Sequence, residues 1–455
     1  MASMDGQGQL IPGGIHQMWR INIRNGAFAA VIGLSLLAAA GTAQSAASEP
    51  RTSYVANNFG SDAPAAPAAK IIWSSTMDLQ GDESAMSQGS AVAGGGKVYI
   101  IQQGQLLALN AQTGKRVWKY GAKLTAPLLY QDGLIYASSQ AGTIYAINAA
   151  TGKNNWSSSV PSKAPYQLLI DQNQLFAVNG DIQVYNLKDG KLQWKDNYSE
   201  KLYLPVQVQG DLVFAEDSVS GAYSYELLHA FDRKTGKQLW EADNHALPID
   251  VGSGTLRSQR TANLIELVPL TTVDTLDAKT GKVLKSVEYN PGNINPDEAL
   301  SSGGRAWISG NQLYINNGNT VYCYPADADP AKTAKITYSA AGGGSSLRYA
   351  AGPYDGRVLF SDGEAVYGVK TTNRYGVSYY GGAPIARFDL LGHGMYIARA
   401  DGQLVAVNLL TGAQVLQLKT SGRVFGPTLL ETGMIIVQSK GKITAFKEPA
   451  VLRID

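Results

Sequence analysis

The sequence predicts an all-β protein, a single closed β-propeller of four-stranded antiparallel blades. Three observations indicate this fold. Glycine accounts for 50 of the 455 residues, more than the usual ~7%, which is typical of a chain with many tight turns. One turn motif recurs along most of the chain, and the two ends of the repeated region complement each other as parts of one blade. The hydrophobic fraction of 44% allows a sizeable core and excludes general disorder.

The first 47 residues are predicted to be an N-terminal extension that carries a signal peptide. Arg20 and Arg24 precede an uncharged apolar run over residues 27–40, and small residues follow, with cleavage expected after Ser45 or Ala47. This order is typical of a Sec-type signal. The run is shorter than the ~20 residues of a membrane span, so we expect no transmembrane span in the mature chain, with an uncleaved anchor as the alternative.

Three further expectations concern the segment ahead of the repeats. The codons of Gly13 and Gly14 can spell a ribosome-binding site just before Met18, so translation starts either there or at Met1. No cysteine follows the apolar run, so the protein is not expected to be a lipoprotein. Residues 48–69 are rich in Ala, Pro and Ser without periodicity and are interpreted as a linker. The mature protein is therefore expected to be periplasmic, secreted or on the cell surface.

A turn motif fills the rest of the chain. In its clearest copy, residues 107–118, a strand leads through Asn110 to Thr113-Gly114, and a second strand follows. Asn or Asp caps such a turn, and glycine accepts the positive φ that the reversal requires. The first three turn glycines are 38 residues apart, a period typical of propellers or solenoids. The glycines assigned to these turns are Gly114, Gly152, Gly190, Gly236, Gly281 and Gly412.

A large aromatic residue stands in the second strand of most copies, where a broad ring can fill the wedge between neighbouring sheets. Five of the seven tryptophans hold this position: Trp73, Trp118, Trp156, Trp194 and Trp240. A second hairpin turn recurs inside each unit, so each unit is a four-stranded meander, which is one blade. Further last strands are expected near Leu284, Tyr338, Tyr379 and Leu416. Because the units over residues 249–290 and 331–380 are degenerate, eight blades are expected, with nine as the alternative.

The ends of the repeated region predict how the ring closes. Residues 71–75 resemble the last strand of a unit with nothing before it, whereas the unit over residues 425–447 stops before its own last strand. Pairing the two completes a blade and removes two open sheet edges. The propeller is therefore assigned to residues 70–449, and residues 450–455 form a C-terminal tail.

The pattern Ala-x-Asn/Asp-x-x-Thr-Gly-x-x-x-Trp resembles the pyrroloquinoline-quinone-like (PQQ-like) propeller repeat over nearly all of residues 70–447. This superfamily includes the quinoprotein alcohol dehydrogenases and non-enzymatic propellers similar to BamB, of the outer-membrane barrel-assembly machinery. The opening strand Trp73-Ser74-Ser75 and the compact repeats are more similar to the second branch. Resemblance to the first would imply a quinone, a Ca²⁺ site with an Asp base and, in many members, a disulfide between adjacent cysteines. Cys323 is the one cysteine, so that disulfide cannot form.

No residue is assigned to catalysis or to a metal site, and no cofactor is expected. His229 lies within a strand and is interpreted as a packed histidine, whereas His245 and His393 are expected at exposed turns. The acidic pairs are interpreted as solvated loop carboxylates, with adventitious Ca²⁺ binding as the alternative. These pairs are Asp327/Asp329 and Asp297/Glu298.

Two segments depart from the repeat and are the predicted contacts with a partner. In residues 373–380, Arg374 and Tyr375 replace the usual Thr-Gly turn, and both residue types are enriched at binding hot spots. Ordinary packing is the alternative for this segment. The insert over residues 216–226 extends the hairpin of the fourth unit and carries Tyr223 and Tyr225.

The sequence therefore favours an exported, monomeric, non-enzymatic propeller that acts as a protein-interaction scaffold in the cell envelope or at the cell surface, with envelope protein assembly as one such role. A charged fraction of 16% and a net charge of +2 exclude a nucleic-acid partner. The alternative is a quinone-dependent dehydrogenase-like enzyme, or another small-molecule-binding enzyme, with its site over the central channel.

Overall fold

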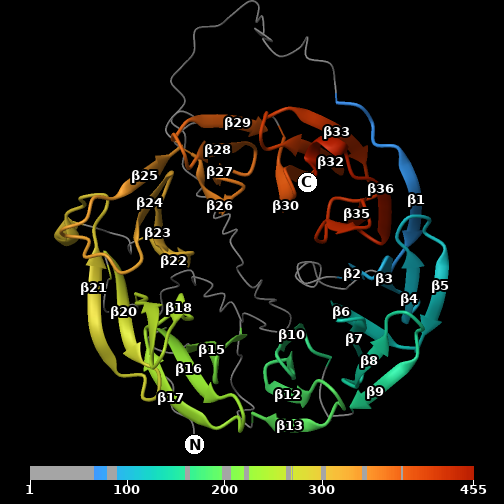
Figure 1. Ribbon diagram of the computed structural model, residues 1–455, viewed down its shortest axis with the longest axis horizontal. Helices are drawn as coiled ribbons and strands as arrows, with labels where there is room; N and C mark the ends of the chain where they lie inside the picture. Colours follow the sequence, from blue (N-terminus) through green and yellow to red (C-terminus); the bar gives the residue numbers. More distant parts are fainter. Residues whose placement is uncertain are drawn as a thin grey trace, which may run out of the picture.

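The computed structural model describes residues 66–78, 90–158, 164–196, 206–219, 225–262, 268, 270–298, 304–340, 346–380 and 383–454. The described residues form nine four-stranded antiparallel sheets that stand as blades around a ring (Figure 1). The first strand of each blade lies nearest the centre, and the fourth lies on the rim. The predicted all-β propeller is confirmed, and the number of blades is nine.

Each blade is a meander in which strands adjacent in the chain are paired. Blades 1 to 3 are formed by β2 (Ala91–Gly94), β3 (Lys97–Gln102), β4 (Gln105–Asn110) and β5 (Arg116–Tyr120); β6 (Leu124–Gln131), β7 (Leu134–Ser139), β8 (Ile144–Asn148) and β9 (Asn154–Ser158); and β10 (Gln167–Asp171), β11 (Gln174–Val178), β12 (Ile182–Asn186) and β13 (Leu192–Lys195).

Blades 4 to 6 are formed by β14 (Val206–Gln209), β15 (Leu212–Val219), β16 (Tyr225–Asp232) and β17 (Gln238–Asp243); β18 (Asp250–Val251), β19 (Thr255–Gln259), β20 (Thr271–Asp277) and β21 (Val283–Tyr289); and β22 (Arg305–Ser309), β23 (Gln312–Asn317), β24 (Thr320–Pro325) and β25 (Ile336–Ser339). A short 3-10 helix, η2 (Pro296–Glu298), lies between blades 5 and 6 in the chain.

Blades 7 to 9 are formed by β26 (Arg348–Tyr354), β27 (Arg357–Ser361), β28 (Val366–Lys370) and β29 (Gly376–Tyr380); β30 (Ile385–Leu391), β31 (Gly394–Arg399), β32 (Gln403–Asn408) and β33 (Gln414–Lys419); and β34 (Leu429–Glu431), β35 (Met434–Ser439), β36 (Lys442–Lys447) and β1 (Ile71–Thr76). A second 3-10 helix, η4 (Ala450–Leu452), follows β36, and its Leu452 is buried. The two degenerate units are both regular four-stranded blades.

The ring closes as the sequence predicts. β1 pairs antiparallel with β36, and Trp73 stands opposite Ala445. The earliest described strand of the chain therefore supplies the outermost strand of the last blade, and Figure 1 shows it beside blade 1. This pairing leaves blade 9 as complete as the other eight.

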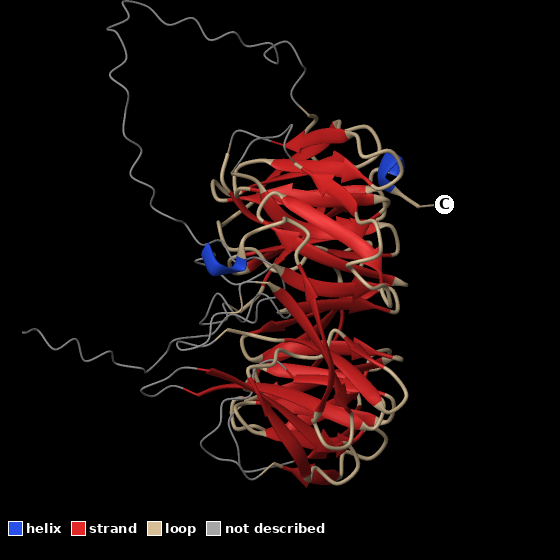
Figure 2. Cartoon of the chain, turned by 90° about the vertical axis from the view of Figure 1, so that its left-hand side faces the viewer, coloured by secondary structure: helices blue, strands red, loops and turns tan. Residues whose placement is uncertain are grey.

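The ring has two unlike faces, which Figure 2 shows edge-on. We name the turn face after the connections between the first and second and between the third and fourth strands of each blade, which include all the Thr-Gly turns. The loop face carries the connections between the second and third strands and those between blades. η4 lies on the turn face, and η2 lies on the loop face.

The Thr-Gly turn forms because one side chain satisfies several backbone groups. In blade 1 the Asn110 Oδ1 accepts hydrogen bonds from the Gln112 and Thr113 amides at 3.1 and 2.9 Å, and from the Thr113 hydroxyl at 3.0 Å. Gly114 then takes a φ of +68°, and its amide donates to the Asn110 carbonyl at 2.8 Å. Blades 2, 4, 5 and 8 repeat this arrangement around Asn148, Asp232, Asp277 and Asn408.

Candidate functional site

The tryptophans lock each blade onto the turn of the next one. A β-bulge in the fourth strand precedes each ring; in blade 1, Trp118 pairs with Ala108, Arg116 pairs with Leu109, and Val117 is left unpaired. Such a bulge re-aims the side chain that follows it. The indole N–H of Trp118 donates to the Ala149 carbonyl in blade 2 at 3.1 Å.

The same contact recurs at five consecutive junctions, with the indole donating to the carbonyl that follows the third strand of the next blade. The pairs are Trp73–Ala111 at 2.7 Å, Trp118–Ala149 at 3.1 Å, Trp156–Leu187 at 2.9 Å, Trp194–Arg233 at 2.8 Å and Trp240–Ala278 at 3.0 Å. Trp118 is half-buried, and the other four rings are buried. These residues are occupied in holding the ring together and are not free for a ligand.

Two of the remaining junctions satisfy the same carbonyl with another donor. In blade 5 the last strand lies near Leu284 as expected, and the position that the tryptophan holds in other blades is taken by Lys285, which pairs with Thr275. Arg257 of blade 5 donates instead, from Nη1 to the Ala326 carbonyl of blade 6 at 2.6 Å. In blade 7 the Tyr379 hydroxyl donates to the Leu409 carbonyl of blade 8 at 2.9 Å.

The hairpin of β15 and β16 projects beyond its blade on the loop face. Ala215 is the last residue of β15 with a partner on β14, yet pairing with β16 continues to Val219 opposite Tyr225. Tyr225 is half-buried on this projection, and Tyr223 lies outside the described residues. The sequence thus located a hairpin that projects past β14, and among the described residues no strand pairs with its outer part on that side.

A carboxylate anchors the base of this hairpin. Glu216 Oε1 accepts a hydrogen bond from the Leu247 amide at 2.5 Å, which ties β15 to the segment that leads into blade 5. Burial raises the pKa of Glu216, the Leu247 amide partly offsets this, nearby Glu226 raises it further, and Arg305 lowers it. Blades 4 and 6 both contribute charge to this place.

A buried ion cluster lies next to it in blade 5. Asp274 Oδ2 is 2.9 Å from His245 Nε2 and 2.9 Å from Arg260 Nε. His245 Nδ1 is 2.7 Å from the Asp243 carbonyl, so both ring nitrogens face acceptors. Burial opposes ionisation of Asp274, but hydrogen bonds from His245, Ser286 and Arg260 outweigh burial and lower its pKa.

This cluster has a structural rather than a catalytic arrangement. Both nitrogens of His245 are committed, so the ring has no free site for proton transfer to a substrate. His245 is buried and His393 half-buried, so the expectation that both are exposed was wrong. His393 Nδ1 lies 3.0 Å from Asp355 Oδ2. His229 is fully buried, as a packed histidine should be.

The second predicted contact lies on the turn face. Arg374 occupies the place of the turn glycine, because its amide donates to the Lys370 carbonyl at 2.9 Å and its φ is +64°. Left-handed backbone is rare for a residue with a long side chain. The next residue, Tyr375, is 70% exposed. Arg374 and Tyr375 therefore lie on the opposite face of the ring from the β15–β16 hairpin, and the two segments cannot form one site.

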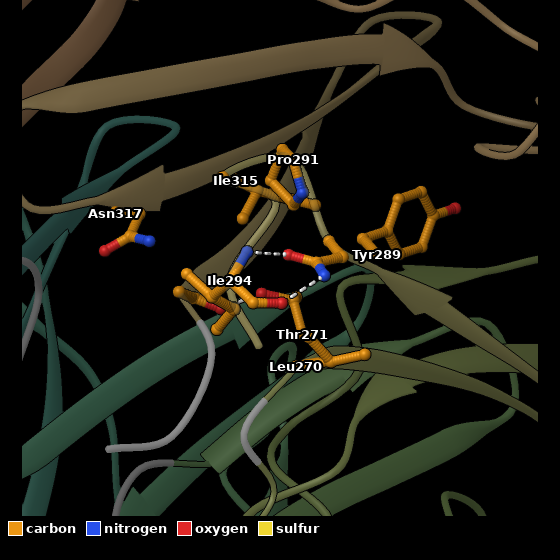
Figure 3. Close-up of a pocket in the computed structure, with 10 residues that line it drawn as sticks. Leu270, Thr271, Tyr289, Pro291, Ile294, Ile315 and Asn317 are labelled. Atoms are coloured by element: carbon orange, nitrogen blue, oxygen red, sulfur yellow. Dashed lines mark hydrogen bonds between the residues drawn. The ribbon is translucent and has the colours of Figure 1, made fainter. Parts of the chain in front are cut away.

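Cavities in the described part of the chain offer no enclosed ligand site. The pocket in Figure 3, between blades 5 and 6, encloses about 10 Å³, no more than one water molecule needs. The Asn290 side chain closes it by bonding both the amide and the carbonyl of Ile294, at 2.9 and 2.8 Å. A depression of about 510 Å³ on the turn face, beside Lys97, Tyr130 and Asp132, is open to solvent.

Comparison with known proteins identifies the repeat. The family described as outer membrane protein assembly factor BamB matches residues 63–126 and 119–249. Residues 63–249 are thus similar to this family. The PQQ-like repeats recognised in the sequence are thereby confirmed over blades 1 to 4. None of the curated proteins compared with the chain matches it.

Several solved propellers are similar to the chain at low identity. BamB from Moraxella catarrhalis is 14% identical over 84% of this chain and 100% of its own, with a TM-score of 0.44. A quinohemoprotein alcohol dehydrogenase from Comamonas testosteroni is 13% identical over 85% and 77%, with a TM-score of 0.42. The computationally designed protein Ika8 is 13% identical over 82% and 98%, with a TM-score of 0.44. Likenesses at this level do not discriminate between functions.

The PQQ-like repeats do not by themselves supply the ligands of a quinone enzyme. Across the ranges that the structure describes, no group of three or more His, Cys, Asp or Glu side chains could hold a metal ion. Asp327 pairs with Arg257 at 3.2 Å, and Asp329 pairs with Lys332 at 2.9 Å, so these carboxylates have partners. No reaction step is derived through a quinone. In the same ranges, no helix has the length and apolar character of a membrane span.

Sequence reasoning missed the buried charged residues. Asp274 lies in the strand Thr271–Asp277, directly after Val273 and two residues before Leu276. A carboxylate at such a position requires cationic partners, and that signal could have pointed to His245 and Arg260. Arg257 has no comparable signal, because its partner Ala326 is 69 residues away in the chain.

Proposed function

We propose that this protein is an exported, non-enzymatic propeller that acts as a protein-interaction scaffold in the cell envelope or at the cell surface, with envelope protein assembly as its context. The family that matches blades 1 to 4 is named for outer-membrane protein assembly, which supports this context. A ring of packed blades is a rigid frame on which connecting loops are free to make contacts.

The projecting hairpin of β15 and β16 carries the proposal. Among the described residues, no strand pairs with residues 216–219 on the side of β14. Such an edge can accept a strand from a partner. Pairing of β16 with β17 ends at Leu227, so the outermost residues of the hairpin lie beyond the blade, and the Glu216 contact anchors its base.

Photo-crosslinking in the native envelope tests the proposal. A photoreactive amino acid at Tyr225 should yield a crosslink to a defined envelope protein, whereas the same group at the exposed Val451 on the turn face should not. Substituting Pro at Asp217 should then remove the crosslink, since proline disrupts strand pairing. If Tyr225 and Val451 give the same products, the hairpin is not a specific contact.

A second contact at Arg374 and Tyr375 is tested separately because it lies on the other face. Arg374→Gly restores the residue that the other turns use, so it should raise stability by about 0.5–1 kcal/mol through relief of backbone strain. The variant should weaken capture of a partner if Arg374 is a contact. If Arg374→Gly is more stable and captures the partner as well as the parent does, this turn has no role in recognition.

The dehydrogenase alternative has a direct test. The purified protein, mixed with pyrroloquinoline quinone and Ca²⁺ and then desalted, should retain no chromophore and should not oxidise alcohols. Stoichiometric retention of quinone together with alcohol oxidation would contradict the non-enzymatic proposal and would show that the protein is an enzyme.

A further inference from the structure

The turn face of blades 1 to 5 carries a band of positive charge that we name the basic arc. It consists of nine exposed cationic side chains in the third-to-fourth-strand turns of these blades. They are Lys115, Arg116, Lys153, Lys188, Lys191, Lys234, Lys237, Lys279 and Lys282. Five of them come from one feature of the repeat, a lysine directly after the turn glycine.

Few negative charges lie within the turns of the arc, while the first-to-second-strand turns of blades 2 to 4, on the same face, add Asp132, Asp171 and Asp211. The same five turns contain three carboxylates, Asp189, Asp232 and Asp277. Asp232 and Asp277 accept hydrogen bonds within their own turns, and Asp189 pairs with Lys191 at 3.3 Å. Nine cations and three carboxylates give these five turns a net charge of +6, which is larger than the net charge of +2 of the whole chain. The turn of blade 6 has two lysines and two aspartates, so the arc ends there.

Exposed aliphatic side chains lie beside these cations. The bulge that aims each tryptophan inward leaves the residue before that position unpaired, as at Val117, Leu239 and Leu284. All three are exposed, between 41% and 57%. Each follows the lysine after the turn glycine by two residues. In blades 1, 4 and 5 the rim of the arc thus carries an apolar side chain beside its cations, whereas blades 2 and 3 have Asn155 and Gln193 at the same position.

We propose that the basic arc docks the propeller on a membrane surface rich in anionic lipid. The charge of the arc is complementary to lipid phosphates, and the aliphatic side chains can enter the headgroup region. Turns of one type from five consecutive blades lie on one face of the ring, so a planar surface can meet all of them together. The β15–β16 hairpin lies on the other face and points away from that surface.

Vesicle co-sedimentation of the whole protein tests this inference. At low salt the protein should bind phosphatidylcholine vesicles that contain phosphatidylglycerol, should not bind pure phosphatidylcholine vesicles, and should dissociate at high salt. Each lysine near an anionic surface raises affinity about fivefold. The triple variant Lys153→Glu, Lys237→Glu and Lys282→Glu should therefore bind at least about a hundredfold more weakly.

A matched control changes the same charge on the loop face. Lys419→Glu, Arg423→Glu and Lys440→Glu alter three exposed residues of blades 8 and 9 and should bind nearly as the parent does. Circular dichroism confirms that both variants are folded. Absence of vesicle binding by the parent, or equal loss in the two triple variants, overturns the proposal. Binding of the arc to an acidic protein without vesicle binding also overturns it.

Discussion

The turn glycine of each of blades 1 to 5 leaves room for the indole ring of the preceding blade. A Cβ built on Gly152 would lie 2.7 Å from Cδ2 of Trp118, and one built on Gly114 would lie 2.6 Å from Cδ2 of Trp73. The turn glycine is therefore required twice, for a φ of about +70° and for contact with the ring. This explains why the Thr-Gly pair and the tryptophan recur together in the sequence.

Gly152→Ala should destabilise the protein more than Gly133→Ala does. Both glycines lie in blade 2 with positive φ, but a Cβ on Gly133 meets nothing within 4 Å. Left-handed strain costs about 1–2 kcal/mol in each variant, and the contact with Trp118 adds roughly 1–3 kcal/mol at Gly152. Urea unfolding measures the difference. Equal losses would mean that the ring moves aside freely.

The ion pair of Asp274 should make stability depend on pH. The pKa of Asp274 is lower in the folded protein than its ordinary value of 3.8, so its contribution is present above that value. The contribution is lost as the pH falls through the folded pKa. Asp274→Asn should cost about 3–5 kcal/mol near neutral pH, because it leaves His245 and Arg260 without their acceptor.

The difference between the parent and Asp274→Asn should shrink below about pH 4. Asp401→Asn is the matched control, since Asp401 pairs with Arg399 at 2.6 Å but is 41% exposed. An exposed pair contributes about 0–1 kcal/mol, so this control should show little change. A loss at Asp274 that stays constant down to acid pH would contradict the assigned ionisation.

At the scale of the blade, the junctions share the same backbone carbonyl as acceptor, although the side chain that donates to it differs. The carbonyl after the third strand accepts a side-chain hydrogen bond from tryptophan at five junctions, from Arg257 at the junction of blades 5 and 6, and from Tyr379 at that of blades 7 and 8. An unsatisfied buried carbonyl is costly, so the donor is replaced when the ring is absent. In the degenerate units, another side chain therefore donates the hydrogen bond that tryptophan donates elsewhere.

Arg257→Met should weaken the junction of blades 5 and 6. The variant removes the donor to the Ala326 carbonyl and the pairs with Asp250 and Asp327, at 2.6 and 3.2 Å. The expected loss is about 1–3 kcal/mol. Arg257→Lys keeps the charge but cannot reproduce the planar fork, and should recover part of that loss. If urea unfolding gives Arg257→Met the same free energy of unfolding as the parent, water donates to the Ala326 carbonyl in place of Arg257.

The sequence was sufficient to predict the elements that repeat, because each copy carries its own local turn and strand signals. Gly114, Asn110 and Trp118 belong to one short segment, and pattern alone relates them. Arg257 and the cluster around Asp274 could not be predicted, because their partners come from distant segments and follow no period. That Tyr225 and Arg374 lie on opposite faces of the ring also depends on topology. Tyr225 lies at a connection between the second and third strands of a blade, whereas Arg374 lies at a connection between the third and fourth strands.

At the scale of the whole molecule, closure joins two strands 366 or more residues apart in the chain. β1 pairs with β36, and Trp73 also donates to the Ala111 carbonyl of blade 1, so one strand fastens blade 9 to its neighbour. A ring converts two exposed sheet edges into internal contacts. Its loss should therefore affect every blade and not only the two that meet at the junction.

A variant that begins at Gly81 lacks β1 and should unfold at a clearly lower urea concentration than one that begins at Ala66, which keeps it. Trp73→Ala alone should cost about 3–5 kcal/mol, and the deletion should cost more because it also removes the strand pairing. Adding a peptide of residues 66–78 to the shortened chain should restore part of the stability, since its binding site on β36 remains. Identical unfolding of the two shortened chains, with no effect of the peptide, would mean that the propeller is stable as an open ring and that β1 does not fasten it.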